Sequence, residues 1–134
     1  MDVIDLDANA TTRPLPEVVE SVARHLRESY GNPGSRHALG RRARQVLETS
    51  RDTIAAILGA EPDEVLFTSG GTEANNLAIF GLPRGNRGTI TLSPGTHPSL
   101  NEACVAMQQR GWNLHRFPVD RNGLINPDVS AAAP

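Results

Sequence analysis

Apolar and polar residues repeat along the chain with two different spacings, which predict helices and strands. The helical spacing covers residues 15–30, residues 38–58, a segment that follows the polar turn at residues 69–72 and ends near Gly81, and residues 98–110. Short apolar runs typical of buried strands cover residues 64–68, 89–92 and 113–119. This alternation indicates an α/β fold with a mainly parallel sheet and flanking helices.

The segment before the first helix has a weaker pattern. Residues 3–7 alternate loosely and form either a short strand or an extended arm, and residues 7–12 are small and polar, as in a loop. Pro16 suits the first position of the following helix, and Gly31 suits its end. Near the other end of the chain, residues 120–123 (DRNG) predict a tight turn.

The polar turn at residues 69–72 connects a predicted strand to a predicted helix. The first N–H groups of a helix have no intrahelical partners and carry partial positive charge, so this position suits an anion. Gly70 and Gly71 have no Cβ and let a ligand approach, and Ser69 and Thr72 can donate hydroxyl hydrogen bonds to phosphate. Alternatively, Thr72 only caps the helix and the glycines only form the turn. The residues match neither the Walker loop nor the dinucleotide-binding turn.

A second candidate phosphate-binding feature is a group of arginines on the helix predicted over residues 38–58. Arg41, Arg42 and Arg44 could bind a phosphate. However, Glu48 follows Arg44 by four residues, so the two side chains can form an ion pair. This pairing favours a solvated helix face over a binding patch.

The composition of the chain argues against several functional classes. The 134 residues amount to one domain at most, and the net charge of −2 with only 4% aromatic residues gives no reason to expect nucleic-acid binding. No apolar run approaches the roughly 20 residues of a membrane span, so we expect no membrane insertion and a cytoplasmic location. The single cysteine, Cys104, excludes an internal disulfide and a multi-cysteine metal site, and we expect no bound metal.

Four stretches in order resemble the cysteine desulfurases, a family of fold-type-I pyridoxal-phosphate enzymes in the class V aminotransferase group. They are residues 6–12 (LDANATT), residues 30–37 (YGNPGSRH), residues 67–76 (FTSGGTEANN) and His97. The resemblance extends over nearly the whole chain and implies the N-terminal portion of the large domain of this fold. It further implies an N-terminal arm near the active-site mouth over residues 1–15 and an incomplete cofactor-binding large domain over residues 16–134.

The resemblance also implies a cofactor and roles for six residues. Gly71 and Thr72 match the positions that bind the phosphate of pyridoxal 5′-phosphate. His97 matches the histidine that stacks on the cofactor ring and assists proton transfer. The substrate side is implied to include Ala10, Thr11 and Asn32. Taken without the resemblance, residues 10–11 are a surface loop and His97 only begins a helix.

For an intact enzyme the resemblance implies conversion of L-cysteine to L-alanine, with the sulfur held as an enzyme persulfide for a sulfur-acceptor protein in iron–sulfur cluster assembly. It also implies a homodimer. The chain contains no lysine to hold the cofactor as a Schiff base, and Cys104 lies on the apolar face of a predicted helix, so it does not replace the catalytic cysteine. We therefore expect the 134 residues alone to lack desulfurase activity.

Two alternatives remain open. The chain could be a non-catalytic remnant or one half of a split enzyme that acts only through a partner chain, since exposed strand edges favour pairing. Within the enzymes, selenocysteine lyase and other class V members are alternatives. Small departures from the family pattern, at Arg13 and beside His97 at Thr96 and Pro98, leave the subfamily open.

Overall fold

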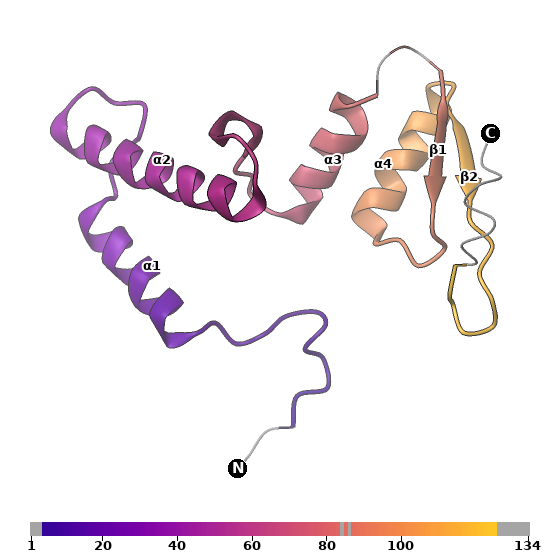
Figure 1. The fold of residues 1–134 in the computed structure, drawn as a ribbon, viewed down its shortest axis with the longest axis horizontal. Helices are drawn as coiled ribbons and strands as arrows, with labels where there is room; N and C mark the ends of the chain where they lie inside the picture. Colours follow the sequence, from indigo (N-terminus) through magenta and orange to yellow (C-terminus); the bar gives the residue numbers. More distant parts are fainter. Residues whose placement is uncertain (1–3, 84, 86, 126–134) are drawn as a thin grey trace. The chain divides into compact units, whose positions relative to one another are not determined.

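The computed structural model describes residues 4–83, 85 and 87–125 (Figure 1). Its elements follow the order α1 (Pro16–Glu28), α2 (Ala38–Leu58), the 3₁₀ turn η1 (Pro62–Glu64), α3 (Gly71–Gly81), β1 (Thr89–Leu92), α4 (Pro98–Gln109) and β2 (Asn113–Arg116). The chain divides into two compact units, Met1–Leu66 and Phe67–Pro134. Each unit is described separately.

The first unit is built around the long helix α2. The loop before α2 packs directly on its first turn, because a Cβ added to Gly40 would lie 2.3 Å from the carbonyl oxygen of Ser35. Gly59 ends the helix in the left-handed conformation with φ of 66°, which suits a residue without a side chain. Farther along, the guanidinium of Arg51 donates to the carbonyl oxygen of Val65, which ties the segment after η1 back to α2.

The second unit contains a β-α-β arrangement that is visible in Figure 1. Strands β1 and β2 are parallel, with Thr89 opposite Asn113 and Leu92 opposite Arg116, and helix α4 connects them. Helix α4 also packs against both β2 and α3. The buried apolar side chains of this unit lie on β1 and α4; they are Leu92, Ala103, Cys104 and Met107. This arrangement confirms the α/β class and the parallel sheet.

The structure corrects the strand predicted over residues 64–68. Residues 62–64 form the turn η1 and residues 65–68 pair with no other strand in the described part of the chain. Leu66 is 73% exposed and Phe67 is 46% exposed, so this segment is not buried. Val65 does have extended backbone angles. Local preference therefore produces an extended segment, but a strand also requires a neighbour that completes its hydrogen bonds.

Other predicted boundaries differ by smaller amounts. Residues 4–7 form no strand, and β2 ends at Arg116 although the apolar run continues to Val119. Val119 instead forms an isolated antiparallel bridge with Ile125 across the predicted turn, where the N–H of Gly123 donates to the carbonyl of Asp120. Among the described residues, no helix combines the length and the apolar character needed to cross a bilayer.

Candidate functional site

A cavity of about 520 Å³ in the second unit brings together two of the predicted site residues. Thr72 from the start of α3 and His97 from the residue before α4 both line it, although they are far apart in sequence. The complete lining is Thr72, Asn76, Phe80, His97, Pro98, Ser99, Glu102, Ala103 and Ala106. The lining therefore combines polar residues at or near the starts of α3 and α4 with small and aromatic residues of the same two helices.

The start of α3 is open to a ligand. Gly70 is the N-cap residue, and no side chain caps the helix. A Cβ built on Gly70 or Gly71 would meet no atom within 4 Å, so no packing contact in the described chain requires glycine at either position. Helix geometry leaves the first N–H groups without intrahelical partners. A bare, uncapped helix start beside a cavity suits a phosphate group.

This geometry corrects the alternative in which Thr72 caps the helix. Thr72 is the second residue of α3, not its N-cap, and its side chain lines the cavity. Its hydroxyl is therefore placed where it can donate to a bound anion. The structure therefore contradicts the capping interpretation, and the phosphate-binding role of Thr72 remains a prediction.

Ser69 is expected from the sequence to donate a hydrogen bond to phosphate, but in the structure it donates to Glu73. Its hydroxyl donates to Oε2 of Glu73 at 2.7 Å, and its backbone N–H donates to the same oxygen at 2.6 Å. The backbone hydrogen bond, followed by the hydroxyl hydrogen bond, lowers the pKa of Glu73 below its ordinary value. The hydroxyl of Ser69 is thus hydrogen-bonded to the carboxylate of Glu73. Of these two hydroxyl residues, Thr72 is the one that lines the cavity.

His97 is the N-cap residue of α4. Its Nδ1 accepts from the backbone N–H of Ser99 at 3.2 Å and lies 2.8 Å from the Ser99 hydroxyl. The Ser99 hydroxyl also accepts from Nδ2 of Asn75 on α3 at 2.8 Å. These contacts connect Asn75 of α3 to the first turn of α4, and they hold the ring of His97 at the edge of the cavity.

The three predicted substrate-side residues belong to the first unit. Ala10 and Thr11 lie in an exposed loop, where their N–H groups donate to the carbonyl oxygen of Asp7. Asn32 is exposed, and its Oδ1 accepts from the N–H of Gly34 at 2.8 Å, which closes a tight turn. The structure thus shows a local loop-forming contact for each of these residues, and their substrate roles remain predictions.

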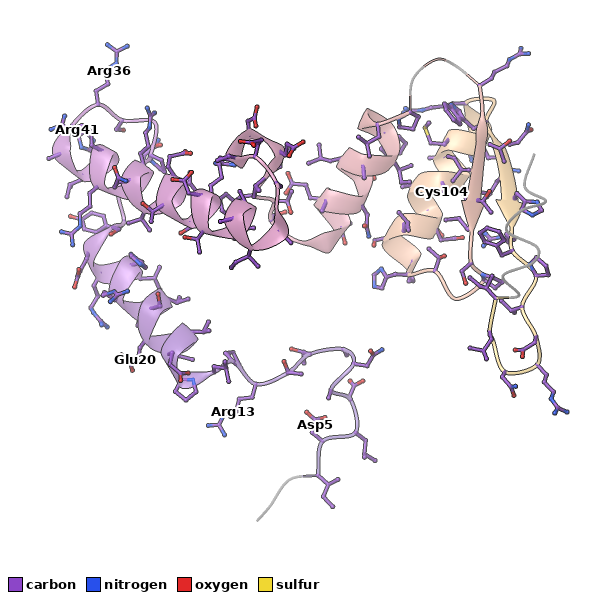
Figure 2. The ribbon with its side chains drawn as sticks, viewed as in Figure 1. Asp5, Arg13, Glu20, Arg36, Arg41 and Cys104 are labelled. Carbon is purple, nitrogen blue, oxygen red and sulfur yellow. The ribbon has the colours of Figure 1, made fainter. Side chains whose placement is uncertain are left out.

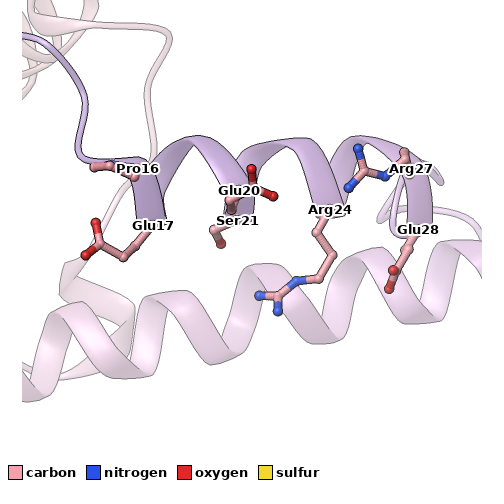
Figure 3. A pocket seen from close by; sticks show the side chains of 7 residues that line it. All are labelled: Pro16, Glu17, Glu20, Ser21, Arg24, Arg27 and Glu28. Atoms are coloured by element: carbon pink, nitrogen blue, oxygen red, sulfur yellow. The ribbon is translucent and has the colours of Figure 1, made fainter.

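A larger hollow of about 610 Å³ lies on α1 and is shown in Figure 3. Its lining residues all come from this one helix: Pro16, Glu17, Glu20, Ser21, Arg24, Arg27 and Glu28. Acidic and basic side chains are mixed along it, so it has no single sign of charge for an ionic ligand. We regard it as a solvated helix face.

The arginines of α2 mainly stabilise the loop before that helix. Arg44 donates from Nε to the carbonyl oxygen of Pro33 at 2.9 Å, and Arg41 donates to the carbonyl oxygen of Arg36. Figure 2 shows Arg36 and Arg41 at this end of the helix. The predicted ion pair of Arg44 with Glu48 is not formed, because Glu48 pairs with Arg51 at 3.1 Å. These contacts favour a structural role over phosphate binding.

Cys104 is fully buried on α4, beside the sheet (Figure 2). Burial raises the pKa of its thiol, and the charge of Arg116 only partly opposes this rise. A buried thiol with a raised pKa is a poor nucleophile, since the thiolate is the reactive form. This placement confirms the prediction that Cys104 belongs to the core.

Sequence reasoning missed the residues that complete the cavity. Thr72, Asn76 and Phe80 lie four residues apart on α3, so they share one face of that helix. Ser99, Ala103 and Ala106 repeat with helical spacing on α4 in the same way. This spacing is readable from the sequence once the helix starts are known. The sequence does not show that the two faces meet.

The residues present fit pyridoxal 5′-phosphate in two respects. The uncapped start of α3 offers backbone N–H groups and a hydroxyl to a phosphate, and no Cβ obstructs Gly70 or Gly71. The imidazole of His97 offers a flat surface at the same cavity.

Comparison with known proteins identifies the family to which the chain belongs. The class-V aminotransferase family matches residues 4–133, so the chain is a member of that family. Among its relatives are a cysteine desulfurase IscS of Dictyoglomus turgidum, 42% identical over 127 residues, and a NifS/IcsS protein homolog of Lactobacillus delbrueckii subsp. bulgaricus, 39% identical over 134 residues. The matched regions cover 92% and 98% of this chain but only 32% and 35% of the lengths of the two relatives. The chain therefore spans about a third of the length of these relatives.

Solved structures give the same fold. A protein described as SspA in complex with cysteine matches 93% of this chain and 37% of its own, with a TM-score of 0.82 and 30% identity. A NifS-like protein matches 88% of this chain and 33% of its own, with a TM-score of 0.77 and 33% identity. The resemblance to cysteine desulfurases stated from the sequence is thus confirmed at the level of family and fold.

Proposed function

We propose that this chain forms the phosphate-binding and ring-stacking part of a pyridoxal-phosphate-dependent cysteine desulfurase. The observation that carries the proposal is the shared cavity of Thr72 and His97, at the uncapped start of α3. The relatives named cysteine desulfurase support the substrate class. The protein described as SspA in complex with cysteine supports L-cysteine as the ligand of such a fold.

Each residue has a role that follows from its position. The backbone N–H groups at Gly71 and Thr72, with the Thr72 hydroxyl, would bind the cofactor phosphate. His97 would lie against the flat ring and move a proton at its free ring nitrogen. Pyridoxal phosphate, when bound, supplies an electron sink for bond cleavage in the amino acid. Ala10, Thr11 and Asn32 are proposed to contact the substrate, on the family resemblance alone.

The complete reaction would convert L-cysteine to L-alanine and leave the sulfur as a persulfide for an acceptor protein. The 134 residues contain no lysine, so covalent attachment of the cofactor would require a residue outside them. The same observation favours the second candidate, a chain that acts only with a partner that carries the lysine and the reactive cysteine. A homodimer and a cytoplasmic location belong to the proposal on the resemblance alone.

The phosphate site is tested by titrating the purified 134-residue chain with pyridoxal 5′-phosphate and following the cofactor absorbance. We expect reversible binding that inorganic phosphate displaces. Thr72→Ala should weaken binding by about tenfold, because a hydrogen bond to a charged phosphate is lost. Thr53→Ala is the matched control, since Thr53 is exposed on α2 and donates to its own helix at the carbonyl of Thr49.

Two outcomes would contradict the proposal. One is an absence of saturable cofactor binding by a chain that is folded by circular dichroism. The other is binding that phosphate does not displace and that Thr72→Ala leaves unchanged. Unchanged affinity in Thr53→Ala is required before an effect of Thr72→Ala is assigned to the cavity.

A further inference from the structure

Two polar residues outside the predicted set, Asn75 and Ser99, are connected to His97. Nδ2 of Asn75 donates to the hydroxyl oxygen of Ser99 at 2.8 Å. The same hydroxyl lies 2.8 Å from Nδ1 of His97, and the backbone N–H of Ser99 donates to Nδ1 at 3.2 Å. Asn75 and Ser99 are both partly buried, so the hydrogen bond between them is partly sheltered from water, whereas His97 and its two contacts with Ser99 are exposed.

The directions of these hydrogen bonds determine the state of the imidazole. Nδ1 accepts from a backbone N–H, so it carries no proton in the neutral ring. Because Nδ1 is already an acceptor, the Ser99 hydroxyl donates to Nδ1 in their contact, while the Ser99 oxygen accepts from Asn75. Nδ1 is thus held as an acceptor by two donors, and the remaining proton of the neutral ring lies on Nε2.

We propose that Asn75 and Ser99 are positioning residues that hold His97 in its Nε2–H tautomer and fix its ring at the cavity. The hydrogen bonds of His97 in the described chain all fall on Nδ1, which leaves Nε2 as the nitrogen for a ligand or a proton. Asn75 lies one turn after Thr72 on α3, so the network also joins the phosphate-binding turn to the histidine. The value of this arrangement for the cofactor ring rests on the proposed function.

A purely structural interpretation is that His97 and Ser99 only cap α4. Capping requires the backbone N–H of Ser99 and the Nδ1 acceptor, but it requires neither the Ser99 hydroxyl nor Asn75 on another helix. The proposal therefore differs from capping in what it expects of these two side chains. Their removal should change the imidazole while α4 stays formed.

The test is a long-range proton–nitrogen NMR spectrum of the 134-residue chain labelled with ¹⁵N-histidine. The spectrum is recorded at about pH 8, above the ordinary pKa of histidine. His97 is one of four histidines and is assigned by the signals lost in His97→Gln. We expect neutral His97 to be entirely the Nε2–H tautomer, with the Nδ1 shift of a hydrogen-bonded acceptor. The same chain unfolded in urea gives the unconstrained reference.

Three variants separate the effects of the Ser99 hydroxyl and the Asn75 amide on the NMR signals of His97. Ser99→Ala removes the hydroxyl, and we expect the Nδ1 signal to move toward the urea reference. Asn75→Asp has nearly the same shape but cannot donate, so the Ser99 hydroxyl should turn to the carboxylate and produce the same change. Ser99→Thr keeps the hydroxyl and should keep the wild-type spectrum. Circular dichroism of each variant verifies that the helices remain.

The proposal is overturned if wild-type His97 carries its proton on Nδ1, or if Ser99→Ala and Asn75→Asp leave its signals unchanged. Titration of the same samples with pyridoxal 5′-phosphate then examines the link to the cofactor. Weakening of binding by about two- to tenfold in both variants is expected for one lost hydrogen bond. Equal affinity in all variants would refute the link to the cofactor. Failure of the wild-type chain to bind would instead refute the proposed function and leave the NMR result standing.

Discussion

The polar residues of the first two turns of α3 have different partners because each occupies a different helical position. Glu73 is the third residue of the helix, and its carboxylate reaches back to the N–H and hydroxyl of Ser69. Thr72, one residue earlier, faces the cavity instead. Asn75 faces α4 and donates to Ser99. Residues 72, 73 and 75 point in different directions because successive helical residues are rotated by about 100° around the axis.

The Ser69–Glu73 contact predicts a pH-dependent contribution to stability. The backbone hydrogen bond and then the hydroxyl hydrogen bond of Ser69 lower the pKa of Glu73 in the folded chain. A lowered folded-state pKa contributes stability above the unfolded-state value, and this stability is lost as the pH falls through the lowered pKa. Glu73→Gln should therefore be less stable than wild type at pH 7, and the difference should shrink as the pH falls through the lowered pKa of Glu73.

Urea unfolding of both proteins across this pH range measures the difference. Glu20→Gln, at an exposed position of α1 for which the described structure gives no hydrogen bond, is the matched control. The difference in stability between wild type and Glu20→Gln should not shrink in this way as the pH falls. A difference between wild type and Glu73→Gln that stays constant from neutral pH to acid would contradict the assignment of the stabilising bonds to the charged carboxylate.

At the scale of elements, the helices depend mainly on local signals and the strands depend on neighbours. Helix α2 spans residues 38–58 as predicted, between the capping side chain of His37 and the left-handed Gly59. Strand β1 also matches its prediction, because β2 lies parallel beside it. The segment at residues 65–68 has a similar composition but no strand partner among the described residues, and it remains outside the sheet.

The close contact between α2 and its preceding loop predicts opposite effects of one substitution at two helical glycines. Alanine is favoured over glycine within a helix by about 1 kcal/mol. At Gly40, however, the new Cβ would lie 2.3 Å from Ser35 O and 2.7 Å from Asn32 O. Gly40→Ala should therefore lower the free energy of unfolding by about 1–3 kcal/mol, as overpacking typically does.

Gly81→Ala is the matched control for that prediction. A Cβ at Gly81 would meet no atom within 4 Å, and the residue ends α3. This variant should be unchanged or slightly more stable in the same urea unfolding experiment. If Gly40→Ala proved as stable as Gly81→Ala, the loop would not be packed on α2 in the way the structure shows.

At the scale of the whole molecule, much apolar surface remains exposed. Four apolar residues of α1 illustrate this, with Val18, Val19, Val22 and Leu26 each at least half exposed. No residue of α1 is buried, although the helix has a strong separation of apolar and polar faces. Exposed apolar surface of this extent favours association and dye binding. The described core is small, with its buried apolar residues confined to α2, β1 and α4.

This distribution predicts that two leucine-sized residues will respond oppositely to replacement by glutamine. Leu26 is 72% exposed on α1, so Leu26→Gln should reduce the fluorescence of a bound apolar dye and change stability by at most about 0.5 kcal/mol. Met107 is 5% exposed in the core of the second unit, so Met107→Gln should cost about 1–3 kcal/mol and increase dye binding.

Dye fluorescence and urea unfolding of Leu26→Gln and Met107→Gln test this prediction. Light scattering at several protein concentrations adds a measure of association, which Leu26→Gln should decrease. A large loss of stability in Leu26→Gln would show that the α1 face is already covered in the isolated chain, and would contradict its exposure.

Several features could be determined from the sequence alone. The spacing of apolar residues and the positions of proline and glycine located all four helices and β1, because these signals act within a few residues along the chain. Separate stretches, mostly in loops and turns, supported the resemblance to cysteine desulfurases, and the family match over residues 4–133 confirms it at the level of the family. The core position of Cys104 also followed from helical spacing.

Only the tertiary structure decided which faces meet and which polar groups are left for a ligand. The sequence could not show that Asn75 reaches Ser99 from another helix, that Ser69 is taken by Glu73, or that Thr72 is left for the cavity. Nor could it show that residues 65–68 lack a strand partner in the described chain. Helix spacing is set by neighbours in sequence, whereas hydrogen-bond partners and strand pairing are set by segments that become neighbours only after folding.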